Sequence, residues 1–434
     1  MEQEELKRKI MGLWEKTTHN SKEHVATLFD YYFDINNVEY EESQGKVVCA
    51  LFGIPFNFGY GKNRLKALYM VPLFSEEDLK KKGVLSELIS RLNDRIKNEF
   101  DFSFLVPHSE LLEDFFGTQG YFSSFYILEE RYTPLHDFKN DYILSLKDSD
   151  DRIKELKTHL FDEIRVVVNE NISLSAQNHI ISFIESIEKK ATSSISLSHS
   201  TNDLDYILQQ QNLRNLNPAI AYDSDVNVSG VAFIQKDDIK RIKIVAIYVE
   251  DTCSYYALLN TIKSQYPDYS ISVITSDPKY QAHSLIQQVY VAENPAGPDL
   301  DNTFGVEEIP FNVNKLLQPL GMVRLLRFEN ILDFIASTRS DVDFKLDIRD
   351  YRQEGEASKE ENEKTDASLH NIYIVKNGKL SVTPKKEIKD EHSVLNLSTK
   401  ELSELLLRKN DSSNLIMEAF GIPRLNLQMR LLPC

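Results

Sequence analysis

Apolar and polar positions follow two different rhythms along the first part of the chain. Residues 10–14 and 25–32 keep the spacing of three and four that is typical of helices with one buried face. Residues 38–43 and 46–55 instead alternate with a period of two, and Gln44-Gly45 separates them as a hairpin turn would. The pattern therefore predicts two helices followed by a β-hairpin.

A strand, a basic turn and a helix come next. Residues 65–73 read as a strand, and the apolar positions between Val84 and Ile96 then fall at helical spacing. A further strand near residue 104, a helix that ends near residue 118 and a strand over 121–131 complete the series. We expect these elements to form a first domain that spans residues 1–138.

The same order of elements returns later in the chain. After two amphipathic segments between residues 153 and 187, the pattern predicts a helix over 204–211. Three strands, a helix and a strand follow, at 219–222, 228–234, 242–249, 255–262 and 270–275. This is an internal repeat of the strand, helix, strand core, and we expect a second domain over residues 139–322.

A third set of elements follows residue 322. A helix is predicted over 328–335, a strand over 342–348 and a hairpin over 372–382 around Asn377-Gly378. Ser398 and Glu401 have the spacing of a capping box at a helix start. The intervening residues 353–367 are rich in Glu and Lys, so we expect a mobile loop there and a third domain over residues 323–434.

The basic turn before the first repeat's helix predicts an anion site. Lys80-Lys81-Lys82-Gly83 places positive charge and a glycine where a helix begins, and the first N–H groups of a helix have no partner within it. Glycine also lets a ligand approach the backbone closely. In the second repeat the corresponding turn, Glu250-Asp251-Thr252-Cys253-Ser254, has two carboxylates and no glycine, so we expect it to repel a phosphate.

Composition narrows the classes of function. The chain has 434 residues, 41% of them hydrophobic, and a formal net charge of −17, which argues against nucleic-acid binding and fits a cationic substrate. Cys49, Cys253 and Cys434 lie far apart, so neither disulfides nor a metal site are indicated. We expect a cytoplasmic protein without a membrane segment, and self-association stays open.

Three segments carry a resemblance to a known family. Lys80 to Leu85, and Phe104 to Tyr121, resemble the coenzyme-binding turn and the following strand and helix of Eis-type acetyltransferases of the GNAT superfamily. The phrase Leu320-Gly321-Met322-Val323-Arg324 is similar to the join that precedes their sterol carrier protein-like domain. The resemblance implies an α/β fold with mixed α+β sheets. In it, two tandem GNAT-like domains, the second one degenerate, precede a sterol carrier protein-like domain.

The resemblance also implies a cofactor and the residues that bind it. Acetyl-CoA is the expected cofactor, with its pyrophosphate in the basic turn and its pantetheine arm along the preceding strand, where that strand separates from its neighbour. The residues assigned to it are Val71, Leu73, Lys80, Lys81, Lys82, Gly83, Val84 and Leu85.

The same resemblance points to candidates for the catalytic groups. The family tyrosine that protonates the departing thiolate corresponds to Phe116, which has no proton to give, so Tyr121 and Tyr69 are alternatives for which core packing is the competing interpretation. Family members use the terminal carboxylate as the base, which here is that of Cys434. His108, Glu110 and Glu76 are side-chain alternatives for the base.

These observations lead to one main hypothesis and two rivals. The main hypothesis is an acetyl-CoA-dependent N-acetyltransferase that acts on a primary amine of a small cationic substrate. The first rival is a catalytically inactive GNAT-fold protein that binds a ligand or regulates. The second, lipid carriage by the C-terminal domain, rests on analogy of fold.

Overall fold

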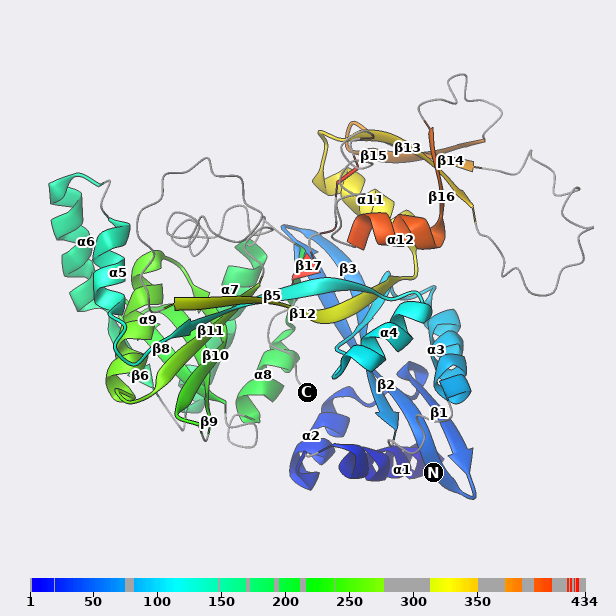
Figure 1. Ribbon diagram of the computed structural model, residues 1–434, viewed down its shortest axis with the longest axis horizontal. Helices are drawn as coiled ribbons and strands as arrows, with labels where there is room; N and C mark the ends of the chain where they lie inside the picture. Colours follow the sequence, from blue (N-terminus) through cyan, green and yellow to red (C-terminus); the bar gives the residue numbers. More distant parts are fainter. Residues whose placement is uncertain are drawn as a thin grey trace, which may run out of the picture. The chain divides into compact units, whose positions relative to one another are not determined.

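The computed structural model describes most of the chain: residues 2–18, 20–74, 82–146, 149–168, 172–190, 195–210, 216–237, 239–276, 313–349, 371–384 and 394–407, with 420, 422–423, 425 and 427–428. Packing divides the chain into two compact units (Figure 1). Unit 1 comprises Met1–Thr18, Tyr32–Phe125 and Leu320–Leu427, and unit 2 comprises His19–Tyr31, Tyr126–Pro319 and Gln428–Cys434. The three consecutive domains with boundaries at 138 and 322 stay a prediction.

Unit 1 contains a mixed sheet with the strand order β1, β2, β3, β4, β12. The pairs β1/β2, β2/β3 and β4/β12 are antiparallel, whereas β3 and β4 are parallel and joined by helix α3. The elements in the N-terminal part of unit 1 are α1 (Glu2–Thr17), η1 (Ile35–Asn37), β1 (Val38–Ser43), β2 (Lys46–Tyr60), β3 (Asn63–Phe74), α3 (Lys82–Ile96), β4 (Phe102–Leu105), α4 (Glu110–Thr118) and β5 (Phe122–Tyr132). Strand β5 begins in unit 1 and continues into unit 2.

The core of unit 1 lies between α3 and the sheet. Apolar residues of α3 pack on β2 and β3 and on the end of α4, because their helical spacing puts them on one face. The turn between β1 and β2 has positive φ angles at both Gln44 (52°) and Gly45 (75°), which a two-residue hairpin requires. The predicted helices, hairpin, strand and crossover helix are confirmed.

Unit 2 repeats this plan. Its strands run in the order β6, β8, β9, β10, β11, β5, and only the pair β10/β11 among these is parallel, joined by helix α9. Its elements are α2 (Lys22–Tyr32), α5 (Phe138–Ser145), α6 (Asp151–Glu163), β6 (Arg165–Val168), α7 (Leu174–Lys190), β7 (Ile195–Ser198), α8 (Thr201–Gln209), β8 (Asn217–Tyr222), β9 (Val228–Asp237), β10 (Arg241–Val249), α9 (Thr252–Gln265) and β11 (Ser270–Ser276).

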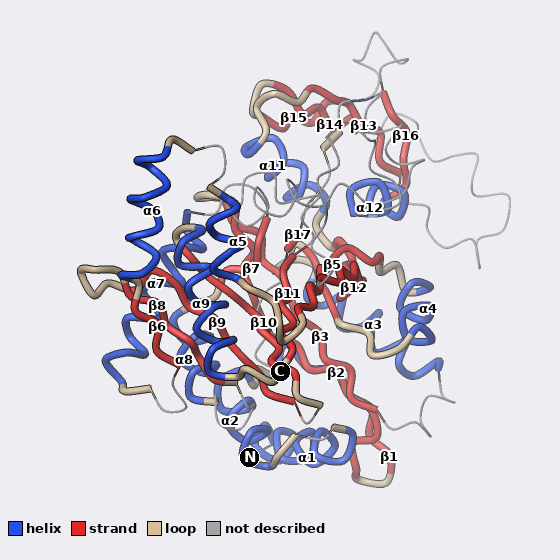
Figure 2. Tube along the Cα trace, turned by 60° about the vertical axis from the view of Figure 1, so that its left-hand side comes forward, coloured by secondary structure: helices blue, strands red, loops and turns tan. Residues whose placement is uncertain are grey.

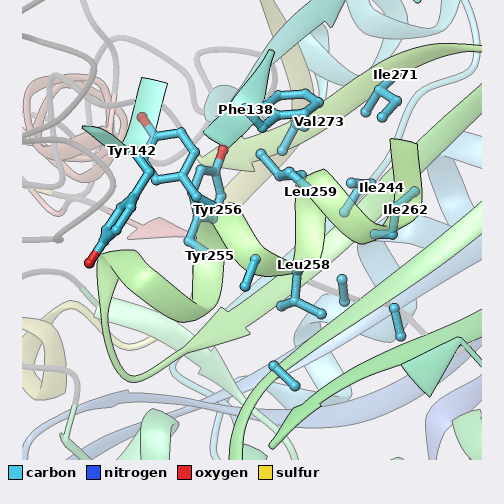
Figure 3. Close-up of a cluster of buried hydrophobic side chains, with 14 of the residues drawn as sticks. Phe138, Tyr142, Ile244, Tyr255, Tyr256, Leu258, Leu259, Ile262, Ile271 and Val273 are labelled. Carbon is cyan, nitrogen blue, oxygen red and sulfur yellow. The ribbon is translucent and has the colours of Figure 1, made fainter. Parts of the chain in front are cut away.

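Helix α9 covers one face of this second sheet (Figure 1, Figure 2). Tyr255, Leu258 and Ile262 of this helix form one buried cluster with Ile244 and Val273 of the parallel strands, and Tyr142 of α5 lies at the end of the cluster near Tyr255 (Figure 3). All of these side chains are nearly inaccessible to solvent. The predicted internal repeat is thus present as a repeat of topology, with α9 in the place of α3.

The two sheets exchange their last strands. In unit 2, residues 127–132 of β5 pair with residues 271–276 of β11. In unit 1, residues 322–325 of β12 (Val313–Leu325) pair with residues 102–105 of β4. The paired strands are far apart in the chain: about 140 residues separate β5 from β11, and about 220 separate β4 from β12.

A smaller sheet follows β12 in unit 1. Its strand order is β15, β14, β13, β16, and Figure 1 shows α11 and α12 on the same side of it. The elements are α11 (Phe328–Thr338), β13 (Asp343–Arg349), β14 (Asn371–Lys376), β15 (Lys379–Pro384), β16 (Val394–Ser398) and α12 (Thr399–Leu407). The two-residue β17 (Leu427–Gln428) is a strand of the larger sheet.

Polar contacts fix this smaller sheet to the first one. Asn330 of α11 donates a hydrogen bond to Asp101 Oδ1 at 2.8 Å, and the main-chain N–H of Leu326 donates to Asp101 O at 2.9 Å.

The predicted capping box is confirmed, since Ser398 N–H donates to Glu401 Oε2 at 2.7 Å and Glu401 N–H to Ser398 Oγ at 3.1 Å.

Several elements were not expected from the pattern. Among them are α5, β6, β16 and β12, the last of which contains the phrase Leu320 to Arg324. That phrase is a sheet strand rather than a simple join, because Met322 enters the core of unit 1 and Val323 is buried. The expected loop at 353–367 lies outside the described residues.

Candidate active site

The site begins where β3 separates from β4. Among the described residues, their parallel pairing covers Ala67 to Tyr69 on β3 and ends at the pair Tyr69 and Phe104. Strand β3 nevertheless stays paired with β2 as far as Phe74. The predicted separation of this strand from its neighbour is therefore present, and it leaves the edge of β3 from Met70 onward free of β4.

The register of β3 shows which main-chain groups face that free edge. Lys66 N–H donates to Asp101 Oδ2 at 2.7 Å, and Lys66 O accepts from Asp101 N–H at 2.8 Å, so the main chain of Lys66 faces the β4 side. The pairing with β2 runs without a shift from Tyr60/Asn63 to Cys49/Phe74. Since main-chain direction alternates along an antiparallel strand, Met70 and Phe74 face the same side as Lys66.

This register differs from the expectation for two coenzyme residues. The N–H and C=O groups of Val71 and Leu73 face β2 instead of the free edge. Pro72 does face the free edge, but it has no N–H and offers only its carbonyl oxygen. The main-chain donors available at the edge are those of Met70 and Phe74, which the sequence interpretation missed. The two-residue turn between Tyr60 and Asn63 fixes this alternation and could have revealed it.

Helix α3 follows β3 in the chain and begins with N–H groups that the helix itself does not pair. It begins at Lys82, so the N–H groups of Lys82, Gly83, Val84 and Leu85 have no acceptor within the helix. Its first turn has no acidic residue, Gly83 is exposed, and a Cβ added there would meet no atom within 4 Å. Leu85 contributes only its main chain, because its side chain is buried in the core.

The basic side chains of the turn cannot be placed in the same way. Lys80 and Lys81 lie outside the described residues, and of Lys82 only the backbone is described. Their role in holding a phosphate stays a prediction.

The corresponding helix in unit 2 begins differently. The Asp251 carboxylate caps α9 and accepts a hydrogen bond from Ser254 N–H at 2.7 Å. Strand β10 also separates from β11 after the pair Ile244 and Val273. The backbone plan of the site is thus repeated, but a carboxylate already occupies the position where an anion would bind.

Helix α4, next to β4, is also unsuited to an anion. Ser109 caps it by accepting from Leu112 N–H, and Glu110 and Glu113 lie in its first turn. Negative side chains at a helix start satisfy its dipole and repel a phosphate. Unlike α4, helix α3 has no acidic residue in its first turn.

Tyr121 is held inside the core. Its hydroxyl lies 2.8 Å from Ser103 Oγ and 3.3 Å from Asn93 Nδ2, and the side chain is 1% exposed. Burial is the main cause of its raised pKa, so the hydroxyl stays protonated. Asn93 is eleven residues beyond the start of α3, or about 16 Å along the helix axis. These surroundings favour a packing role for Tyr121.

Phe116 has similar surroundings. It is 1% exposed in the same core cluster, and its ring contacts Tyr121 edge-on with the centroids 6.0 Å apart. Tyr69 is also buried and stacks on Phe104 at 5.1 Å. The aromatic residues considered as acids thus all belong to packed clusters.

The candidates for the base fall into two groups. His108 and Glu110 are exposed on the segment between β4 and α4. Glu76 and Cys434 lie outside the described residues, so the expected return of the terminal carboxylate to the first sheet stays a prediction.

The described residues contain no group of three or more His, Cys, Asp or Glu side chains that could hold a metal ion. In the same residues, no helix is both long and apolar enough to cross a membrane.

Comparison with known proteins shows the fold. No protein-family model matches the chain, and no curated protein matches it. A crystal structure from Enterococcus faecalis, described as a probable N-acyltransferase, is 14% identical, with 95% of this chain and 90% of that chain covered and a TM-score of 0.60.

Two other solved structures agree with it. A GCN5-related N-acetyltransferase from Anabaena variabilis is 13% identical, with 97% and 96% of the two chains covered and a TM-score of 0.60. Eis1 from Mycobacterium abscessus is 11% identical, with 96% and 90% covered and a TM-score of 0.55. The chain therefore has the mixed α/β fold of GCN5-related N-acetyltransferases over nearly its whole length.

Proposed function

We propose that this protein is an acetyl-CoA-dependent N-acetyltransferase of the Eis type, with one coenzyme site, in unit 1. The observations that carry the proposal are the edge of β3 that β4 leaves unpaired and the glycine-containing start of α3, which has no acidic residue in its first turn. A separated strand offers main-chain groups to amides, and a helix start offers N–H groups to phosphate. Both features lie in one unit and in consecutive elements.

The residues present fit the coenzyme. In the proposal, the N–H groups of Gly83, Val84 and Leu85 bind the pyrophosphate, and Lys80, Lys81 and Lys82 add positive charge. The main chain of Met70 and Phe74 pairs with the amides of the pantetheine arm. Bound acetyl-CoA supplies the thioester carbonyl that an amine attacks.

The chain must also orient the amine and accept its proton. The net charge of −17 supports a cationic substrate with a primary amine. We propose the terminal carboxylate of Cys434 as the base, with His108 and Glu110 as alternatives at the exposed segment before α4. A group that protonates the departing thiolate is not assigned, since Phe116 lacks a hydroxyl and Tyr121 is enclosed by Ser103 and Asn93.

A second candidate function rests on Phe116. Its phenyl ring stands where the resemblance predicts an acidic hydroxyl, and it is fully packed. The alternative is a catalytically inactive protein that keeps the fold and binds an acyl-CoA as a ligand or regulatory signal.

Two finer proposals concern the rest of the chain. We propose that the four-stranded sheet with α11 and α12 is a sterol carrier protein-like domain, supported by the resemblance of the segment that precedes it. We also propose a cytoplasmic location.

Release of free thiol from acetyl-CoA in the presence of polyamines and aminoglycosides tests the main proposal. We expect amine-dependent release that Gly83→Asp abolishes, because a carboxylate at the start of α3 repels the pyrophosphate. Gly12→Asp is the matched control, since Gly12 on α1 also has open space around it and lies outside the site. Coenzyme binding without thiol release for any amine in the panel would favour the inactive alternative.

A further inference from the structure

A proline lies in the middle of the free edge of β3. Among the described residues, β4 pairs with β3 no further than Tyr69 and Phe104. Beyond that pair, the main-chain groups on the free edge belong to Met70, Pro72 and Phe74. Met70 and Phe74 each offer an N–H and a C=O group, whereas Pro72 offers only C=O because its nitrogen carries no hydrogen. The edge therefore has two complete positions with an incomplete one between them.

The pairing with β2 shows that the missing N–H belongs to this edge. Pro72 lies opposite Leu51 in a pairing without a shift. It follows Lys66 by six residues, and Lys66 N–H donates to the Asp101 carboxylate on the β4 side at 2.7 Å. An even number of residues preserves the main-chain direction along an antiparallel strand. Strand β2 therefore loses no hydrogen bond at Pro72, and the proline affects only what binds along the free edge.

The backbone on both sides of Pro72 is held in place. Met70 and Leu73 are each 1% exposed, and Met70 belongs to the core cluster that Leu85 of α3 also joins. Strand β3 also stays paired with β2 before and after Pro72. A rotation of β3 that presented other main-chain donors would break these contacts. A ligand along the edge must therefore use the donors that Met70 and Phe74 provide.

We propose that Pro72 sets the affinity of this site for the pantetheine arm of coenzyme A, an inference that rests on the proposed function. Each amide of the arm has an N–H group that donates to a strand carbonyl and a carbonyl that accepts from a strand N–H. At Pro72 the arm can donate to the carbonyl, but the amide carbonyl next to it has no strand donor. The arm is thus held by one hydrogen bond fewer than along a complete edge.

The missing donor concerns the arm and not the phosphates. In the proposed function the pyrophosphate binds at the start of α3, whereas Pro72 lies on β3. Acetyl-CoA and free coenzyme A have the same arm, so Pro72 lowers the affinity for both alike. It therefore raises the KM for acetyl-CoA without changing kcat for the chemical step. The weaker hold also speeds the release of free coenzyme A after transfer.

Isothermal titration calorimetry with coenzyme A and with ADP, which has a pyrophosphate but no arm, tests this inference. Pro72→Ala and Pro72→Val each restore an N–H on the edge. We expect each to lower the dissociation constant for coenzyme A about three- to tenfold, the value of one net hydrogen bond, and to leave that for ADP unchanged. Agreement between the two variants assigns the gain to the N–H, since their side chains differ in size and shape.

A proline outside the site provides the matched control. Pro384 on β15 pairs with Asn371 in the smaller sheet, and Pro384→Ala should leave both dissociation constants unchanged. Coenzyme A affinity that stays the same or falls in both Pro72 variants overturns the role of Pro72. Equal tightening for coenzyme A and ADP also overturns it, because the gain would not come from the arm. If neither the wild type nor the variants bind coenzyme A, the proposed function itself fails, and this inference fails with it.

Discussion

Phe116 in the last turn of α4 and Tyr121 just after the helix differ by one hydroxyl group, which needs hydrogen-bond partners when it is buried. The Tyr121 hydroxyl has Ser103 and Asn93 within hydrogen-bond distance. Phe116 packs beside it with an apolar ring and is equally buried. The sequence allows Tyr121 to be the catalytic acid in place of Phe116, which has no proton to give, whereas the contacts in the structure favour packing for both.

Phe116→Tyr should therefore destabilise unit 1 without restoring an acid. We expect a loss of about 1–3 kcal/mol in the free energy of unfolding, since the new hydroxyl enters an apolar cluster. Trp14, the single tryptophan, is buried in unit 1 and reports the transition by fluorescence during urea unfolding. Phe115→Tyr is the control with a less buried ring, and a stable, faster Phe116→Tyr variant would contradict this reading.

A carboxylate on β5 should make unit 2 sensitive to acid. The hydrogen bond from Arg131 is the largest cause that lowers the pKa of Glu129 from 4.5 to about 2, and Ser272 and Arg241 also favour the charged form while burial opposes it. Because the pKa is lower in the folded state, Glu129 stabilises unit 2 above about pH 4.5, and this contribution is lost as the pH falls toward about 2.

Glu129→Gln should remove that contribution. At neutral pH we expect a loss of about 1–3 kcal/mol in the free energy of unfolding of unit 2, with a shallower decline as the solution is acidified. Circular dichroism during urea unfolding at several pH values measures both effects. A variant as stable and as acid-sensitive as the wild type would show that solvent screens the pair with Arg131.

At the scale of elements, the two crossover helices share a position and differ at their first residues. Helix α3 has space around Gly83 in its first turn, whereas the Asp251 carboxylate caps α9. The sequence shows this difference between the two turns, because charge and glycine at a helix start act locally. The main-chain direction of β3 depends instead on its pairing with β2, which follows from the two-residue turn before Asn63.

Asp251→Ala should weaken α9 and leave coenzyme binding unchanged. The loss of an N-cap costs about 0.5–2 kcal/mol, whereas Asp251→Asn should retain most of the stability because asparagine is also a good cap. Thermal unfolding followed by circular dichroism measures the first effect, and calorimetric titration with coenzyme A the second. A second coenzyme site in Asp251→Asn would show that the negative charge of Asp251 alone prevents coenzyme binding in unit 2.

At the scale of the whole molecule, the exchange of strands was beyond sequence reasoning. Local patterns predict β5 and the helix after residue 328. They do not show β12 as a strand, because its partner β4 is more than 200 residues away in the chain. Pairing between distant strands leaves no local signal beyond an apolar run. The fold class, by contrast, follows from the order of elements and is confirmed by the similar structures.

Arg324 should matter to unit 1 despite its distance in sequence. Its Nη1 donates to Gln119 O at 2.9 Å at the end of α4, and it lies on the exchanged strand. Arg324→Ala should lower the free energy of unfolding reported by Trp14 by about 1.5–3 kcal/mol, the value of a hydrogen bond to a charged donor. Arg339→Ala is the control, since Arg339 forms an exposed pair with Asp341 that solvent screens, so its loss should change stability little. Equal effects of the two substitutions would argue against a structural role for the exchanged strand.

The central claim is that the chain has one coenzyme site and that it lies at the start of α3. Isothermal titration calorimetry with coenzyme A tests it most directly in the wild type, Gly83→Asp and the control Gly12→Asp. We expect one coenzyme A site per chain in the wild type and in Gly12→Asp, and no coenzyme A binding to Gly83→Asp. Two equal sites, or binding that survives Gly83→Asp unchanged, would contradict it.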